Sequence, residues 1–435
     1  RKQTVSLKDT FCSSPWIHAR LSANGQLDYC RWATHFDAEQ NPENNIRNID
    51  PIEYFQKKMA SIRQDFLDGK AVEKCHQCYA QDKHDKVSGR QRQLLKVGVT
   101  VDRFEKTLQS SPVRNELEYS SDNNGLTNYL PIDWQVDLGN HCNGACIYCG
   151  PQWSSKLAAE FKKIGFIDEI PAKPWTESPE LIDRFVNTLK QTKHLAYIHF
   201  LGGETVITPA FRTILQALID NGISKTVTIG FTTNLTVWDQ EIIDMLCEFK
   251  EVNLGMSVEC FDPVNDYVRY PSKIDKVSQV TQQWVDVARQ NNWLLQFRIT
   301  PSCLTISKLL TVFDYAYDNE ISVESCNFMT EPSFLAPNVL PTELREPIIK
   351  QLEQWVVSKQ IADSDDKIIN TRHQAFAQQQ IVQDAQSYIT YLKNEPVVDE
   401  TGKMIDFLKK LEQSRGNKIT DYLPEYDDYL RTAGY

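Results

Sequence analysis

Residues 137–150 read DLGNHCNGACIYCG, and this stretch is the most informative part of the chain for its fold. It follows an apolar, strand-like run and places three cysteines, Cys142, Cys146 and Cys149, within eight positions. Thiolates are soft ligands that suit iron–sulfur clusters. Three close cysteines can hold three irons of a [4Fe–4S] cube and leave the fourth iron without a protein ligand. The stretch therefore predicts a cluster with one open metal position.

The region around this stretch, residues 131–330, alternates strand-like and helix-like segments. Strands are expected at Trp134–Leu138, Tyr197–Leu201, Val227–Thr232, Val252–Val258, Leu294–Ile299 and Val323–Phe328. Helices are expected at 209–221, 239–249, 275–290 and 305–318, where apolar residues recur three and four positions apart. This alternation implies parallel strands joined by right-handed crossovers. The sequence thus predicts an α/β fold, a partial barrel of six strand–helix units, with chemistry at the C-terminal ends of the strands.

Three further regions flank this predicted barrel. Residues 1–95 form a small Cys-rich module, residues 96–130 a polar connector, and residues 331–435 a helical C-terminal region without cysteine. In that last region we expect helices at 342–358, 372–392 and 402–413. They carry no catalytic constellation, so the sequence predicts a helical cap over the barrel.

Composition excludes several other classes of protein. The chain has 435 residues and a formal net charge of −11, and no long basic block that would neutralise duplex nucleic acid. No apolar run is long enough to span a membrane, and the first ten residues lack the apolar stretch of a secretory signal. Most of the eleven cysteines fall in local groups within a long chain, which indicates metal ligation in a reducing, cytoplasmic setting.

The cysteine spacing, with Tyr148 just before the last cysteine, resembles the signature of the radical S-adenosylmethionine (SAM) superfamily. The resemblance implies that SAM chelates the open iron and that Tyr148 contacts this cofactor. It also implies that one electron, from a donor such as flavodoxin or ferredoxin, breaks the sulfonium bond. A 5′-deoxyadenosyl radical then removes a hydrogen atom from the substrate. The alternative is a zinc site with His141 or a distant residue as the fourth ligand.

Two motifs of the predicted barrel add to this resemblance. Gly202, Gly203 and Glu204 follow the second expected strand, where the family often has Gly-Gly-Glu-Pro in contact with the amine of SAM. Here Thr205 stands in place of proline. Glycines let a backbone approach a ligand closely, and a carboxylate suits an ammonium group. After the third strand, Asn234 matches the family's Thr-Asn-Gly near the cofactor's ribose, although a turn role for Asn234 is an open alternative.

The fourth strand carries further candidates. Ser257, with Arg269 twelve residues later, resembles the family segment that binds the carboxylate of SAM, and Arg298 on the fifth strand competes for this role. A guanidinium fork fits a carboxylate well, but either arginine could instead form an ordinary ion pair. Glu259 and Cys260 replace the family's Asp and Gly here. Cys260 is a candidate hydrogen-atom donor, and the alternative is a buried small apolar side chain.

The N-terminal cysteines suggest a second metal site. Cys12, Cys30, Cys75 and Cys78 could close a [4Fe–4S] cluster completely, as suits electron transfer or structure. The pattern resembles the auxiliary modules called SPASM and Twitch, which usually follow the barrel but here precede it. The resemblance implies one auxiliary cluster. A structural Cys₄ zinc site is the alternative.

These patterns predict a radical SAM enzyme with an auxiliary cluster. In the family such clusters often accompany crosslinking, epimerisation or oxidation of peptides, so a peptide is the expected substrate. One alternative is a radical SAM enzyme that acts on a sugar, a nucleotide or another small metabolite. A second is a non-catalytic zinc or iron–sulfur protein. We expect no membrane and no duplex nucleic acid as partners.

Overall fold

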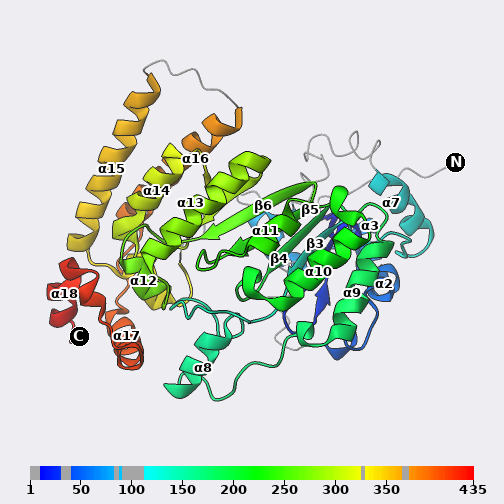
Figure 1. Ribbon diagram of the computed structural model, residues 1–435, viewed down its shortest axis with the longest axis horizontal. Helices are drawn as coiled ribbons and strands as arrows, with labels where there is room; N and C mark the ends of the chain where they lie inside the picture. The colour runs from blue at the N-terminus through cyan, green and yellow to red at the C-terminus, as the bar shows by residue number, and fades with distance from the viewer. Residues whose placement is uncertain (1–9, 31–40, 83–87, 91–111, 325–328, 365–371) are drawn as a thin grey trace. The chain divides into compact units, whose positions relative to one another are not determined.

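The computed structural model describes residues 10–30, 41–82, 88–90, 112–324, 329–364 and 372–435 (Figure 1). Its strands are β1 (His18–Leu21), β2 (Leu27–Asp28), β3 (Asp133–Asp137), β4 (Tyr197–Leu201), β5 (Thr228–Thr233), β6 (Glu251–Ser257), β7 (Leu294–Arg298) and β8 (Ser322–Glu324). They follow the order β2-β1-β3-β4-β5-β6-β7-β8 in the sheet. The β1–β3, β3–β4, β6–β7 and β7–β8 pairs are parallel, and β1–β2 is antiparallel.

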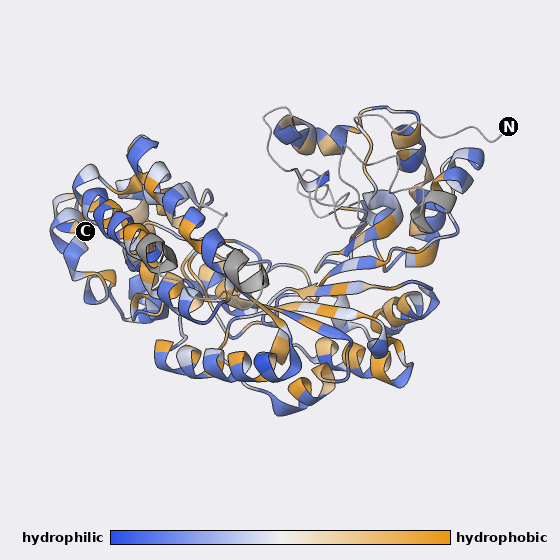
Figure 2. Cartoon of the chain, turned by 90° about the horizontal axis from the view of Figure 1, so that it is seen from above, coloured by the Kyte–Doolittle hydropathy of each residue, from blue (hydrophilic) through white to orange (hydrophobic). Residues whose placement is uncertain are grey.

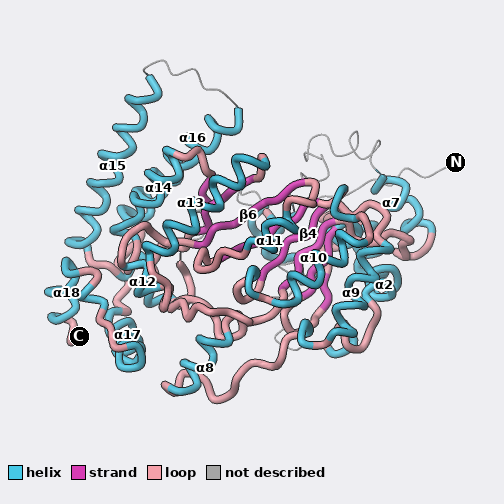
Figure 3. Tube along the Cα trace, viewed as in Figure 1, coloured by secondary structure: helices cyan, strands magenta, loops and turns pink. Residues whose placement is uncertain are grey.

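Helices alternate with the strands from β3 onward, as Figure 3 shows. The N-terminal helices are α1 (Ser14–Ile17), α2 (Pro51–Glu53), α3 (Ala60–Leu67), α4 (His76–Asp82) and α7 (Pro112–Asp122). Those between the later strands are α8 (Ser155–Lys163), α9 (Pro179–Gln191), α10 (Pro209–Asp220), α11 (Gln240–Leu246), α12 (Val264–Val268), α13 (Ile274–Asn291) and α14 (Leu309–Asp318). The C-terminal helices are α15 (Thr342–Ser364), α16 (Arg372–Asn394), α17 (Thr401–Arg415) and α18 (Asp427–Thr432).

The chain divides into two compact units that interleave along the sequence. The first comprises Arg1–Asn140, Ala172–Gly230 and Glu241–Glu251, and the second comprises His141–Pro171, Phe231–Gln240 and Val252–Tyr435. The cysteine stretch thus begins the second unit, while the strand before it belongs to the first. The four-part division by sequence stays a prediction.

The core of the first unit forms around β3. All five residues of β3 are buried, and Trp134 packs edge-on against Phe55 and Phe185 with ring centroids 5.3 Å apart in each case. Figure 2 shows the apolar colouring of the central strands. Helix α9 begins where the Ser178 side chain accepts a hydrogen bond from the backbone N–H of Leu181, and its apolar face is buried. Burial of this kind contributes about 25 cal/mol per Å² of apolar surface.

The α/β fold and the six strands expected between residues 131 and 330 are confirmed, and the ends of the first five differ by at most one position. The sixth expected strand reaches Glu324, and its remainder, residues 325–328, lies outside the described residues. The four barrel helices and the three tail helices are also present. Gly222, two residues after the end of α10, has the left-handed φ of +70° that favours glycine.

Strands β1 and β2 were not expected, because residues 1–95 show no alternating pattern. The reason is that β1 is buried on both faces and contains polar residues. Arg20 forms a buried ion pair with Asp137, with Nη2 and Oδ2 3.0 Å apart, and His18 lies 3.5 Å from the Asp133 carboxylate. Neighbouring β3 supplies these partners, so local periodicity could not reveal the strand.

Within the second unit, the C-terminal helices pack on one another and on the sheet. Helix α16 contacts α15, α14 and β8. In the part of the chain that the structure describes, no helix is both long enough and apolar enough to cross a membrane.

Candidate iron–sulfur site

The loop that carries Cys142, Cys146 and Cys149 is held by backbone hydrogen bonds. The N–H of Ala145 donates to the carbonyl of Tyr270 over 2.6 Å, and the N–H of Ile147 donates to the carbonyl of Val268 over 2.9 Å. The segment after α12 therefore backs the cysteine loop along its length. Such fixed backbone geometry is what a preorganised metal site requires.

The three predicted cluster ligands lie close together in this loop, and each is half-buried. The Sγ atoms of Cys142 and Cys146 both lie 3.7 Å from the point that a Cβ on Gly144 would occupy. Burial, followed by the charges of Cys146 and Cys142, raises the pKa of the Cys149 thiol to about 12. The bare Cys149 thiol therefore stays protonated at neutral pH, and its thiolate would form on metal binding.

The described residues contain no group of three or more His, Cys, Asp or Glu side chains placed to hold one metal ion. In a [4Fe–4S] cube each thiolate binds its own iron, so the three sulfurs need not converge on a single point. The donor set of three soft thiolates in one short loop fits such a cluster.

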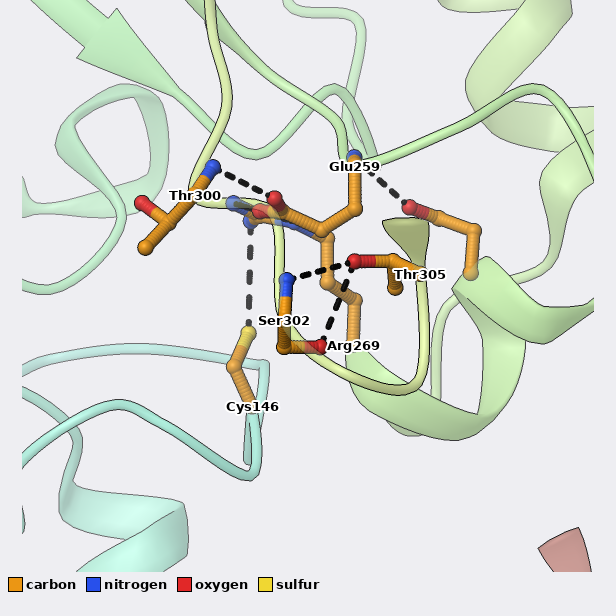
Figure 4. A network of polar contacts seen from close by, with 7 residues as sticks. Cys146, Glu259, Arg269, Thr300, Ser302 and Thr305 are labelled. Carbon is orange, nitrogen blue, oxygen red and sulfur yellow. Dashed lines mark hydrogen bonds and ion pairs between the residues drawn. The ribbon is translucent and has the colours of Figure 1, made fainter. Parts of the chain in front are cut away.

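Arg269 and Glu259 form a buried ion pair beside Cys146 (Figure 4). The Glu259 Oε1 atom accepts from Nε and Nη2 of Arg269 at 3.0 and 2.7 Å, and its Oε2 atom accepts from the backbone N–H of Thr300 at 2.7 Å. The Nη1 atom of Arg269 lies 4.0 Å from Cys146 Sγ. Burial lowers the pKa of Arg269, but the carboxylate of Glu259 outweighs it and holds the pKa above its ordinary value. The pair thus keeps a fixed cation next to a predicted cluster ligand.

Tyr148 belongs to the same neighbourhood. Its hydroxyl is buried, and burial together with the nearby charge of Glu259 raises its pKa well above the ordinary value. The phenol therefore stays neutral. Its predicted contact with SAM stays a prediction.

A cavity of about 210 Å³ opens beside the loop within the second unit. Its wall comprises Asn143, Gly144, Cys146, Asn234, Thr236, Arg269, Pro271, Ser272, Lys273 and Lys276. The cavity thus brings a cluster ligand, amide side chains and cations together. Such a wall suits a small ligand that carries a carboxylate.

Asn234, predicted from the strand end, lines this cavity and is fixed in place. Its Nδ2 atom donates to Oδ1 of Asn143 over 2.8 Å, and its Oδ1 atom accepts from Thr236. The turn interpretation is also supported, because the N–H of Thr236 donates to Asn234 in the pattern of an Asx turn. Asn143, Lys273 and Lys276 were not singled out from the sequence, since no spacing rule marks them.

Ser257 and Arg298 end neighbouring strands in register, so the structure places them side by side. Arg298 Nε lies 3.4 Å from a carboxylate oxygen of Glu324. Both candidate arginines therefore form ion pairs, but only Arg269 lines the cavity. Cys260 follows β6 and has no exposed surface, so its role as a hydrogen donor stays a prediction.

The Gly202–Glu204 motif lies in the first unit, directly after β4. Gly202 has φ +94°, and an added Cβ would lie 2.6 Å from the carbonyl oxygen of Gly139. Only glycine fits this crossing of two loops. The buried Glu204 accepts a hydrogen bond from the N–H of Val206 over 3.2 Å. Its predicted contact with SAM stays a prediction.

The predicted auxiliary cysteines share another neighbourhood in the first unit. The Tyr29 hydroxyl lies 3.4 Å from Cys75 Sγ. Burial raises the pKa of the Cys12 thiol to about 12, and the charges of Cys75 and Cys78 add to this rise. Two hydrogen bonds with Ser14 lower the pKa but do not outweigh burial. Burial likewise raises the pKa of Cys75 to about 12, with Cys30 and Cys78 adding to the shift. The charges of these thiols therefore influence one another, and the auxiliary cluster stays a prediction.

A family model of known proteins matches the part of the sequence that contains the cysteine loop. Residues 136–289 match the family model described as the Radical SAM superfamily. The match includes the three cysteines and Arg269, and it supports an enzyme with a radical SAM domain. No curated protein matches the sequence.

Two solved structures show more distant similarity. SuiB of Streptococcus suis bound to S-adenosylmethionine is 13% identical, with 81% of this chain and 71% of SuiB covered and a TM-score of 0.34. The structure of anSMEcpe with bound AdoMet is 14% identical, with 53% of this chain and 62% of that chain covered and a TM-score of 0.38. At these values the similarity carries no argument about activity or substrate.

Proposed function

Starting from a radical SAM domain over residues 136–289, we propose that this enzyme cleaves S-adenosylmethionine reductively and removes a hydrogen atom from a peptide. The observation that carries the proposal is the backed loop of Cys142, Cys146 and Cys149 beside a cavity that Cys146 lines. The three thiolates would hold the cluster. When bound, a [4Fe–4S] cluster with an open iron supplies the electron that breaks the sulfonium bond of SAM.

The residues of the cavity have separate roles in this proposal. Arg269, oriented by Glu259, brings a fixed cation to the wall, and Lys273 and Lys276 add cations that suit the carboxylate of SAM. Asn234 offers an amide that is already oriented by Asn143. Because these groups are in place beforehand, a bound cofactor loses little to reorganisation of its site.

Further contacts are proposed on the family resemblance. Ser257 and Arg298 would act near the carboxylate, and Gly202, Gly203 and Glu204 near the amine.

The N-terminal module is proposed to hold one auxiliary [4Fe–4S] cluster on Cys12, Cys30, Cys75 and Cys78. The mutual influence of these thiols supports the assignment. Auxiliary clusters in this superfamily often accompany peptide modification, so we propose crosslinking, epimerisation or oxidation of a peptide. The electron donor is proposed to be a flavodoxin or a ferredoxin. For epimerisation, Cys260 is the proposed hydrogen donor.

The test counts iron after anaerobic reconstitution. Wild type should hold about eight irons, and C146A and C75A should each hold about four fewer. C247A is the matched control, because Cys247 is exposed and lies outside both sets. It should retain the full count. Zinc in place of iron in the wild type would contradict the proposal.

The peptide part has its own test. A peptide deuterated at all of its carbon-bound positions should transfer deuterium to the 5′-deoxyadenosine that is formed. Deuterium transfer from a small metabolite, and from none of a set of peptides, would sink this part and leave the cluster assignment intact.

A further inference from the structure

Arg415, the last residue of α17, lies against the cysteine loop although the two are 270 positions apart in the chain. Its Nη2 atom donates to the carbonyl of Ala145 over 2.7 Å. Its Nε and Nη2 atoms also contact the two carboxylate oxygens of Glu160 at 3.0 and 2.7 Å. Only 2% of the side chain is exposed. A buried guanidinium with a forked partner is held in one orientation.

These contacts and those of Tyr270 together hold the middle of the cysteine loop at Ala145. Ala145 donates its N–H to Tyr270 and accepts from Arg415 with its carbonyl, so both of its backbone groups are engaged. The guanidinium also stacks over the Tyr270 ring, with Cζ 4.8 Å from the centroid. Next to Ala145, the carbonyl of Gly144 accepts from the Ser154 hydroxyl over 2.6 Å, and this hydroxyl caps α8. The loop conformation between Cys142 and Cys146 is therefore fixed from several sides.

Helix α17 is itself held in place by hydrogen bonds to Glu412, and these also fix the position of Arg415. The Glu412 carboxylate accepts hydrogen bonds from the hydroxyls of Tyr267 and Tyr435 at 2.9 and 2.7 Å, and from the N–H of Ile419 at 2.8 Å. One turn later the helix ends at Gly416, which has a left-handed φ of +71°. The C-terminal helix is thus tied to α12, the element that precedes the backing segment of the loop.

The charge of Arg415 also reaches the cluster site. Its Nη2 atom donates to the carbonyl of Ala145, the residue directly before Cys146. The Glu160 carboxylate, which Nε and the same Nη2 atom contact, offsets part of this charge. A fixed cation near a cluster favours the reduced, more negative state, and charge and hydrogen bonds around a cluster set its potential.

We propose that Arg415 is a positioning residue for the cluster on Cys142, Cys146 and Cys149. It fixes the loop through Ala145, and with Glu160 it sets the reduction potential of the cluster. This inference rests on the proposed function and adds to it a role for the C-terminal helix, which sequence patterns predict only as a cap.

The experiment measures iron retention and reduction potential, and needs no turnover. R415Q, R415K and E160Q are reconstituted in full-length protein and compared with wild type. R431Q is the matched control, because Arg431 lies in the same tail, is 72% exposed and pairs only locally with Asp427. Far-UV circular dichroism confirms that each variant keeps its secondary structure.

R415Q should lose iron to a chelator about 10- to 100-fold faster than wild type, as for other groups that orient metal ligands. Its potential should become more negative because a cation is lost. E160Q should shift the potential in the positive direction because it removes the offsetting carboxylate. R415K should have a reduction potential close to that of wild type, because lysine preserves the positive charge. It should recover only part of the iron retention, because lysine cannot form the forked hydrogen bonds of the guanidinium.

A purely structural role would not move the two potentials in opposite directions. If wild type binds the cluster, but R415Q has the same iron retention and reduction potential as R431Q, the inference is overturned. The proposed function would still stand. Shifts of R415Q and E160Q in the same direction would overturn the electrostatic part. A wild type that binds no iron would instead overturn the proposed function, and this inference with it.

Discussion

Replacing Glu259 by Gln should destabilise the protein strongly. Its carboxylate is 1% exposed and accepts two hydrogen bonds from Arg269 and one from the N–H of Thr300. The amide oxygen of Gln can still accept from Thr300. Arg269, only 13% exposed, would however keep its charge without a counter-charge. Breaking a buried pair by removing one partner costs about 3–5 kcal/mol, and that is the loss we expect.

The assay is urea unfolding of reconstituted protein, followed by tryptophan fluorescence. D427N is the control, because the Arg431–Asp427 pair is exposed and should contribute no more than about 1 kcal/mol. The double variant E259L/R269M removes both charges and should cost less than E259Q alone. The reasoning is refuted if E259Q unfolds at the urea concentration found for D427N.

Three further predictions concern single residues. G202A should lower the free energy of unfolding by more than about 1 kcal/mol, measured by urea unfolding, because its Cβ would meet the Gly139 carbonyl at a positive φ; unchanged stability would contradict this. Burial raises the pKa of Cys303 from 9.0 to about 12, so its neutral thiol contributes stability below pH 9 that is lost as the pH rises toward 12. From pH 9 to pH 10 the wild type should lose about 1 kcal/mol more than C303A, and parallel curves would refute this. In maleimide labelling at pH 8 followed by mass spectrometry, the exposed Cys247 should react while Cys260 and Cys303 stay unmodified, and rapid labelling of Cys260 would count against its burial.

The sequence predicted those parts of the molecule whose signals are local. The six strands of residues 131–330 are short apolar runs that end in polar or glycine residues, and these runs identify strands directly. The three cysteines of the loop could likewise be grouped from the sequence, because they fall within eight positions, and their role as cluster ligands stays a prediction. Asn234, placed from the end of one strand, does lie on the cavity wall with Cys146.

Residues whose role depends on distant partners could not be predicted. Arg415 lies in a polar helix, and its partners Ala145 and Glu160 are more than 250 positions away. Arg20 interrupts the apolar pattern of β1, and its buried charge is neutralised by Asp137 on the neighbouring strand. In both cases one tertiary contact explains a buried charge that no periodicity could reveal.

The most direct test of the central claim is formation of 5′-deoxyadenosine under anaerobic conditions. Reconstituted wild type and C247A receive dithionite and S-adenosylmethionine, and C146A is treated in the same way. We predict 5′-deoxyadenosine from wild type and C247A and none from C146A, because Cys146 is a proposed ligand of the cluster. Equal amounts from C146A and wild type, or zinc in place of iron in the wild type, would contradict the account.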